Sequence, residues 1–310
     1  MTKLAFVFPG QGSQKLNMLS DFSEENAFKK TFAEAQEALG FDLNDLIKND
    51  EARLNQTEFT QPAILAASIA VWRFFSEKST VRPDFLAGHS LGEYTALVVS
   101  DVLSFSDALK LVHLRGQLMQ QAVKKGEGAM AAILGLDDQG VVEACREAAH
   151  NEVVSAVNFN APGQVVIAGN VNAVTRAIDT AKALGAKRAM LLPVSVPSHC
   201  ILMKPAAEQL AEAFNNVEFH TPKIPVVQNV DANFHNDVAG IKDALIHQLY
   251  NPVQWVKCIK KLAASGVSTY VECGPGKVLT GLNKRIIETA GFYNLDDRAS
   301  FDETITKLSI

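Results

Sequence analysis

The segment Gly88-His89-Ser90-Leu91-Gly92 is the feature that most constrains how this chain folds. It follows a short apolar run and precedes the helix-like stretch Glu93–Val99. A G-x-S-x-G set between a strand and a helix is typical of a nucleophile elbow, a sharp turn that strains the serine backbone and needs glycines beside it. We therefore predict that Ser90 is a nucleophile. We also expect the backbone N–H of Leu91, at the helix N-terminus, to face a developing negative charge.

Composition indicates a globular enzyme with a sizeable core. The chain has 310 residues, of which 47% are hydrophobic and 20% charged, and this length allows one large domain or two. A formal net charge of −5 gives no nucleic-acid signal, and no apolar run reaches the roughly 18 residues that span a membrane. The four cysteines form no C-x-x-C pair, so the sequence predicts neither a zinc site nor a disulfide framework and favours a cytoplasmic setting.

The order of predicted elements indicates two architectures. Strand, glycine loop and helices alternate up to about residue 126, and again from residue 197, in an α/β pattern like that of the α/β-hydrolases. Between them, residues 127–196 read as β-α-β-β-α-β, the ferredoxin-like motif. We predict an α/β fold with a hydrolase-like catalytic core, residues 1–126 and 197–310, and an inserted ferredoxin-like subdomain. No clear periodicity follows Gly291.

A serine nucleophile needs a base, and His199 is the best candidate among the seven histidines. It lies where a predicted strand ends and a helix begins, and the order serine then histidine matches that of α/β-hydrolases. The alternative is a histidine with a structural role. His89 precedes the serine and should point away from it. The remaining five lie in polar surroundings and are predicted to be at the surface: His113, His150, His220, His235 and His247.

Arg115 is the least expected residue in the sequence. It occupies the middle of the apolar face of the helix predicted over Ser106–Val123. A guanidinium on such a face is unfavourable unless an anion meets it. One interpretation is an internal ion pair with an acidic residue, and the other is a clamp for a substrate carboxylate.

Two glycine-rich loops give weaker evidence about function than the motifs above. The loop after the first strand, Pro9–Gln14, does not complete G-x-G-x-x-G, so a dinucleotide site is not expected. Its Gln11 could instead supply a second backbone N–H to an oxyanion. The loop Gly274–Lys277 lacks the spacing of a phosphate-binding P-loop and indicates a tight turn.

Taken together, the motifs resemble the malonyl-CoA:acyl-carrier-protein transacylases of the discrete bacterial fatty-acid type. They span residues 4 to 290 and comprise Phe8–Gln14, Thr60–Ala63, Gly88–Glu93, Arg115-Gly116, Gly128–Met130, Asn158–Gln164, Val196–His199, Gln248–Trp255 and Glu272–Gly276. The resemblance implies a ping-pong reaction, in which malonyl-CoA acylates a serine and the pantetheine thiol of acyl carrier protein takes the malonyl group. It implies no metal or resident cofactor.

The resemblance also implies a role for each candidate residue. Ser90 would be the nucleophile and His199 the general base and acid. The backbone N–H groups of Gln11 and Leu91 would form the oxyanion hole, and Arg115 would hold the malonyl carboxylate. Gln248 would orient the histidine through its backbone carbonyl, a neutral group that fixes the tautomer without the charge stabilisation of an aspartate.

Two other functions remain open from the sequence. A serine hydrolase or thioesterase would share the elbow and the base but would not need Arg115, and an inactive carrier-protein-binding module would form no acyl adduct. A monomer is compatible with the sequence. Docking of an acidic carrier protein onto this acidic chain requires a local basic patch, for which the candidates are Lys124-Lys125, Lys187-Arg188 and Lys284-Arg285.

Overall fold

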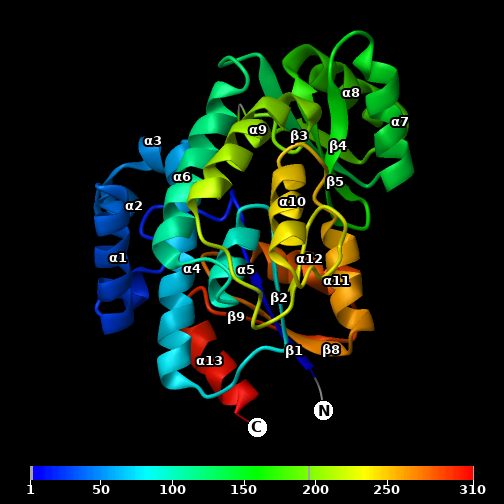
Figure 1. Ribbon diagram of the computed structural model, residues 1–310. Coiled ribbons are helices and arrows are strands. Elements are labelled where there is room, and N and C mark those ends of the chain that lie inside the picture. Colours follow the sequence, from blue (N-terminus) through cyan, green and yellow to red (C-terminus); the bar gives the residue numbers. More distant parts are fainter. Residues whose placement is uncertain (1–2, 195, 310) are drawn as a thin grey trace.

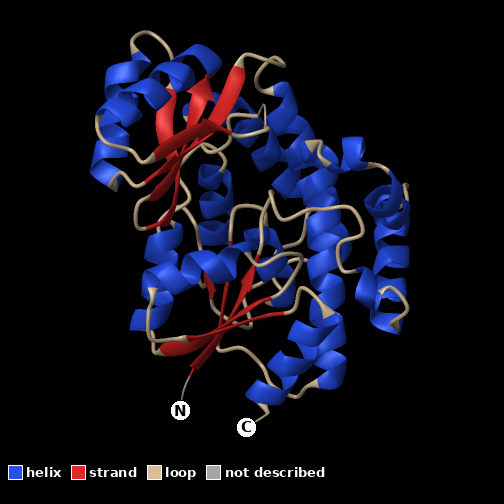
Figure 2. Ribbon diagram, turned by 180° about the vertical axis from the view of Figure 1, so that it is seen from behind, coloured by secondary structure: helices blue, strands red, loops and turns tan. Residues whose placement is uncertain are grey.

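Two β-sheets of different kinds organise the chain (Figure 1). The computed structural model describes residues 3–194 and 196–309. Within these residues, one sheet is five-stranded and parallel, and the other is four-stranded and antiparallel. Figure 2 shows the two sheets from behind, with helices packed around both. The predicted α/β class is confirmed.

The parallel sheet is the centre of the larger part of the molecule. In spatial order its strands are β7 (Val226–Val227), β2 (Phe85–Gly88), β1 (Lys3–Phe8), β8 (Val267–Glu272) and β9 (Gly291–Asn294). Along β1, Phe6 and Phe8 face one core cluster while Ala5 and Val7 face another. A strand that is buried on both faces reads as a continuous apolar run, and this is why β1 could be recognised from the sequence.

Helices cover both faces of the parallel sheet (Figure 1). The helices that share a core cluster with Phe6 and Phe8 are α1 (Asn26–Leu39), α2 (Leu43–Asn49), α3 (Glu51–Leu54), α4 (Thr57–Lys78), α5 (Gly92–Val99), α6 (Phe105–Gln121), α9 (Lys204–Ala213), α10 (Val238–Gln248) and α13 (Arg298–Leu308). The opposite face packs on α11 (Trp255–Ala264) and α12 (Val278–Ile286).

The antiparallel sheet has the predicted ferredoxin-like order of elements. Its strands are arranged as β4 (Val154–Ala161), β5 (Gln164–Asn170), β3 (Gly128–Leu134) and β6 (Arg188–Leu191). The helices α7 (Asp138–Ala149) and α8 (Val171–Ala183) pack on one face, at the top of Figure 1. The other face packs against Cys200, the residue after His199. The limits of the subdomain at residues 127 and 196 stay a prediction.

The two sheets meet beside the ends of β1 and β2. Val253, just before α11, exchanges backbone hydrogen bonds with β4: its N–H donates to Val157 O at 2.8 Å, and Phe159 N–H donates to Val253 O at 3.0 Å. On α12, the guanidinium of Arg285 donates to the carbonyl of Pro162 at 2.7 Å, in the turn between β4 and β5. A further contact, 2.7 Å between Asn160 Oδ1 of β4 and Nε2 of His89, joins the antiparallel sheet to the turn that follows β2.

Some predicted boundaries were wrong. The strand predicted over Ile224–Val230 pairs with β2 only at Val226–Val227, because the chain then turns and the Gln228 N–H bonds back to Asn233 O. The strand predicted to reach Val194 ends at Leu191 as β6. The segment after Gly291, for which no element was predicted, forms β9 and α13.

The structure bears on three exclusions made from the sequence. No helix in the described part of the chain is both long and apolar enough to cross a lipid bilayer. The same residues contain no cluster of three or more histidine, cysteine or acidic side chains that could hold a metal ion. The four cysteines, all of them described, are buried and form no disulfide.

Candidate active site

The turn after β2 has the geometry of a nucleophile elbow. Ser90 adopts a φ of 52°, a left-handed conformation that strains a residue with a side chain. A Cβ added at Gly88 would overlap the backbone of Gly92, and one added at Gly92 would overlap the carbonyl of Phe8 in β1. Only glycine fits at either position, since the strand, the turn and α5 pass within contact of one another.

The loop after β1 lies against this elbow. Because β1 and β2 are parallel neighbours in register at Phe8 and Gly88, their carboxyl ends share one edge of the sheet. The N–H of His89 donates to Phe8 O at 3.0 Å, and a Cβ at Gly10 would overlap His89 O. The backbone N–H groups of Gln11 and Leu91 donate to no protein acceptor among the residues described. Both amides are free to bind an oxyanion.

His199 lies within hydrogen-bond distance of Ser90. Its Nε2 is 2.8 Å from Ser90 Oγ, and its Nδ1 is 2.7 Å from the backbone oxygen of Gln248. A carbonyl oxygen only accepts, so Nδ1 carries the proton and Nε2 is the acceptor for the serine hydroxyl. Burial, and next the charge of Arg115, lower the pKa of His199 to about 3, so the imidazole is neutral at pH 7. The structure thus brings together the serine, the predicted base and the carbonyl of Gln248.

Arg115 lies beside the nucleophile and is 1% exposed. Its Nη1 donates to Gln61 Oε1 at 2.8 Å, and its Nη2 donates to Gln248 Oε1 at 2.9 Å and to Ser90 Oγ at 3.3 Å. These acceptors are neutral, and its Nε has no partner within residues 3–194 and 196–309. The ion pair considered from the sequence is therefore not formed with any carboxylate described. A buried guanidinium without a hydrogen-bonded anion is suited to an anionic substrate group.

Two residues that the sequence did not single out hold the elbow from behind. Asn229 accepts from Ser90 N–H through Oδ1 at 2.7 Å and donates from Nδ2 to Gly88 O at 2.7 Å. The carboxyl group of Glu93 accepts from Asn229 N–H at 2.8 Å and from Gln248 Nε2 at 3.1 Å. Gln248 Nε2 also donates to Ser90 O at 3.0 Å. The carboxamide of Gln248 therefore ties Arg115, Glu93 and the elbow together.

Of the other histidines, two are partnered in the interior. His89 points away from the serine, as expected, because its Nε2 lies 2.7 Å from Asn160 Oδ1 in β4. The prediction that His113 is a surface residue was wrong: it is half-buried, and its Nδ1 lies 2.8 Å from Glu58 O in α4. His150 and His220 are exposed as expected, whereas His235 and His247 are half-buried.

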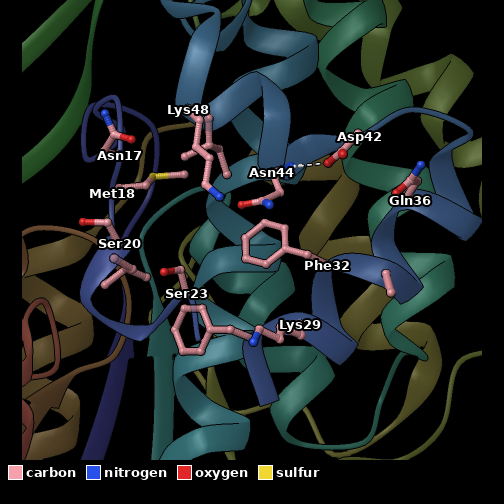
Figure 3. Close-up of a pocket in the computed structure, with 14 residues that line it drawn as sticks. Asn17, Met18, Ser20, Ser23, Lys29, Phe32, Gln36, Asp42, Asn44 and Lys48 are labelled. Carbon is pink, nitrogen blue, oxygen red and sulfur yellow. Dashed lines mark hydrogen bonds between the residues drawn. The ribbon is translucent and has the colours of Figure 1, made fainter. Parts of the chain in front are cut away.

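Among the hollows on the described part of the surface, two can be compared with the candidate site. One, of about 330 Å³, shares Gln11 with the candidate site and is also lined by Lys125 and Val196. The other, of about 250 Å³, lies between α1, α2 and the segment before α1, as Figure 3 shows, and none of the candidate residues lines it. Lys29 in its wall is already paired with Glu24 at 2.8 Å. We therefore take the residues around Ser90 as the candidate active site.

Comparison with known proteins agrees with this geometry. Residues 5–292 match the acyl transferase domain family. The chain belongs to this family. The malonyl CoA-acyl carrier protein transacylase of Salmonella typhimurium is 53% identical over 309 residues, which cover 99% of this chain and 100% of that protein. The protein of the same name from Escherichia coli K12 is 55% identical over 291 residues, 93% and 94% of the two chains. The resemblance drawn from the motifs is confirmed.

Solved structures show the same fold. An acyl carrier protein S-malonyltransferase from Vibrio cholerae superposes with a TM-score of 0.95 at 56% identity, covering 98% of this chain and 100% of that one. A malonyl-transacylase in complex with a type II PKS acyl-carrier protein superposes with a TM-score of 0.97 at 51% identity, covering 99% and 100%. In that structure the related protein is bound to its carrier protein.

Proposed function

We propose that this chain moves the malonyl group from malonyl-CoA to the phosphopantetheine thiol of acyl carrier protein through a malonyl-serine intermediate, supplying fatty-acid chain elongation. The observation that supports this most is one serine hydroxyl within reach of two groups. Ser90 Oγ is 2.8 Å from the Nε2 of His199 and 3.3 Å from the Nη2 of Arg115. A base and a carboxylate-binding cation thus flank the same oxygen.

In the first half-reaction, Ser90 Oγ attacks the thioester carbonyl while its proton passes to Nε2 of His199. The backbone N–H groups of Gln11 and Leu91 stabilise the oxyanion of the tetrahedral intermediate. As the carbon–sulfur bond breaks, the departing CoA sulfur takes the proton from His199. No net proton is released, and Ser90 carries the malonyl ester.

In the second half-reaction, the pantetheine thiol of the carrier protein gives its proton to Nε2 of His199 and attacks the ester carbon. The ester C–O bond then breaks, and Ser90 Oγ recovers the proton. His199 thus acts as base and then as acid in each half, with its tautomer fixed by the backbone oxygen of Gln248. The chemistry needs only side chains, backbone amides and the two substrates, so we propose no resident cofactor.

Arg115 gives this mechanism its preference for a malonyl group. The distal carboxylate of a malonyl group can pair with the guanidinium, whereas an acetyl group would leave the cation without an anion. Pairing also offsets the positive charge that lowers the pKa of His199, so the base becomes stronger when the correct substrate is bound. We place the enzyme in the cytoplasm, in keeping with four cysteines that form no disulfide.

Intact-mass measurement tests the proposal. Incubation with malonyl-CoA should add one malonyl group to the wild-type protein and none to Ser90→Ala, because the adduct is an ester of that hydroxyl. Adding holo acyl carrier protein should then remove the adduct and malonylate the carrier. Release of free malonate instead would indicate a hydrolase, and the absence of an adduct on the wild-type protein would indicate an inactive binding module.

A further inference from the structure

The carboxyl group of Glu93 has no part in the mechanism above, although it is among the most buried groups of the site. It is 0% exposed. Its Oε2 accepts both hydrogen bonds, from Asn229 N–H and from Gln248 Nε2. Its Oε1 has no partner in the described part of the chain. A buried carboxylate with an oxygen that accepts no hydrogen bond is unfavourable, so the ionised form of Glu93 is disfavoured in this position.

The side chain of Gln248 links Glu93 to Arg115. Its Oε1 accepts from the guanidinium at 2.9 Å, while its Nε2 donates to the carboxyl group at 3.1 Å. The carboxamide thus lies between a cation and an anion, with each end facing the charge it can bind. Glu93 and Arg115 make no direct ion pair, but one amide joins them, so a change of charge at Arg115 acts on Glu93.

The surroundings leave Glu93 as a group that titrates near neutrality. Burial raises its pKa to about 7, against the hydrogen bonds from Gln248 and Asn229 and the charge of Arg115, with a smaller upward contribution from Asp231. The other titratable groups that face it stay neutral, because burial raises the pKa of both Tyr94 and Cys258.

We propose that Glu93 is a positioning residue that takes up a proton when the malonyl carboxylate occupies Arg115, and releases it when the malonyl group leaves. The proposal rests on the proposed function. In the empty site, the nearby positive charge of Arg115 favours the ionised form of Glu93. A second carboxylate at the guanidinium offsets the positive charge and adds a like charge, both of which favour the neutral form of Glu93.

The geometry permits this change without loss of contacts. The incoming proton can reside on Oε1, the oxygen without a partner, while Oε2 keeps its bonds from Asn229 and Gln248. The carboxamide of Gln248 keeps its orientation, so its backbone oxygen continues to hold His199. The site therefore accepts a second negative charge with no rearrangement of its hydrogen bonds.

Proton uptake during a single round of acylation tests the proposal on the wild-type enzyme. Acylation consumes no net proton, so malonyl-CoA and acetyl-CoA should differ only through the distal carboxylate. If malonylation raises the pKa of Glu93 by about one unit, roughly half a proton is taken up per malonyl-serine at pH about 7.5. Acetylation should take up none. Any thiol proton lost by the released CoA is common to both and cancels in the difference.

The adduct is quantified by intact mass in the same samples. This measurement separates the proposed function from the proposed role of Glu93. Absence of a malonyl adduct would contradict the proposed function. A full malonyl adduct with no greater proton uptake than the acetyl adduct would contradict the role of Glu93 alone.

Glu93→Gln provides the matching variant, because the amide oxygen still accepts from Asn229 and Gln248 but does not titrate. Proton uptake per malonyl adduct should vanish in this variant. In the wild type, we expect the KM for malonyl-CoA to rise between pH about 6.5 and 8.5, because binding takes up a proton. In the variant this rise should be absent or smaller. Glu272→Gln is the control, since burial also raises the pKa of Glu272 to about 7 but its oxygens bond to the N-terminal amides of α12. Retention of malonyl-specific uptake in Glu93→Gln, or its loss in Glu272→Gln, would overturn the proposal.

Discussion

At the scale of single residues, the candidate site combines groups held in a local turn with groups brought from distant parts of the chain. Ser90 stands in a glycine-flanked turn, and Arg115 is conspicuous on an apolar helix face. Asn229 and Glu93 were not found, because their roles depend on partners that are distant along the chain. Asn229, 139 residues after Ser90, falls in what reads as the end of a strand. No local pattern could indicate that its carboxamide spans the elbow.

Arg115→Ala should reduce malonyl transfer far more than acetyl transfer. Removing one partner of a buried charged pair costs about 2–5 kcal/mol, a fall of roughly 30-fold or more in kcat/KM for malonyl-CoA. Acetyl transfer should hold or improve, since the cation that lowers the pKa of His199 is gone. Single-turnover acylation rates with malonyl-CoA and with acetyl-CoA, measured for the wild type and the variant, give the loss on each substrate. Equal losses on both substrates would show that Arg115 acts through the fold alone.

At the scale of elements, the packing of α6 on α4 shows what the sequence signals and what it leaves out. Pro62 lies inside α4 and has no N–H, so the carbonyl of Glu58 loses its helical donor. The imidazole of His113 on α6 takes its place, with Nδ1 2.8 Å from Glu58 O. Gly116 lets the helices approach, because a Cβ there would lie 2.5 Å from the Cα of Glu58. The proline was visible in the sequence, whereas its partner on another helix was not.

His113→Ala should lower the free energy of unfolding by about 1–3 kcal/mol, because it leaves a half-buried carbonyl without a donor. The loss should shrink in a Pro62→Ala background, where residue 62 regains an N–H that can reach Glu58 O. Denaturant unfolding of the two single variants and the double variant measures the coupling. Strictly additive effects would contradict this pairing.

At the scale of the whole molecule, the order of elements could be predicted from the sequence, but the placement of one sheet on the other could not. The ferredoxin-like order was readable because each of its elements has its own periodicity. The contacts that place this sheet over Ser90 are single long-range bonds, such as those of Arg285 to the β4–β5 turn. They have no periodicity and could not be predicted.

The placement of the sheets also distinguishes two of the three candidate docking clusters from each other. The guanidinium of Arg285 donates hydrogen bonds to Pro162 and Gln164, and Arg285 therefore links the two sheets. By contrast, Lys124 and Lys125 are exposed, and Lys125 lines the hollow that contains Gln11. A carrier protein seated there would have its pantetheine arm next to the proposed oxyanion hole. We therefore expect Lys124-Lys125 to contribute more to docking than Lys284-Arg285.

Lys125→Glu should raise the KM for acyl carrier protein several-fold while leaving malonylation by malonyl-CoA nearly unchanged. The effect should appear mainly in the association rate and fade as salt is added, because the Debye length falls from about 10 Å at 0.1 M to about 3 Å at 1 M. Lys307→Glu is the matched control: it makes the same charge change on an exposed residue of α13, at the opposite end of the molecule from the antiparallel sheet (Figure 1). Carrier-protein kinetics measured from low to high salt should separate the two variants. If both change the KM equally, net charge governs docking; if neither does, the basic cluster has no part in it.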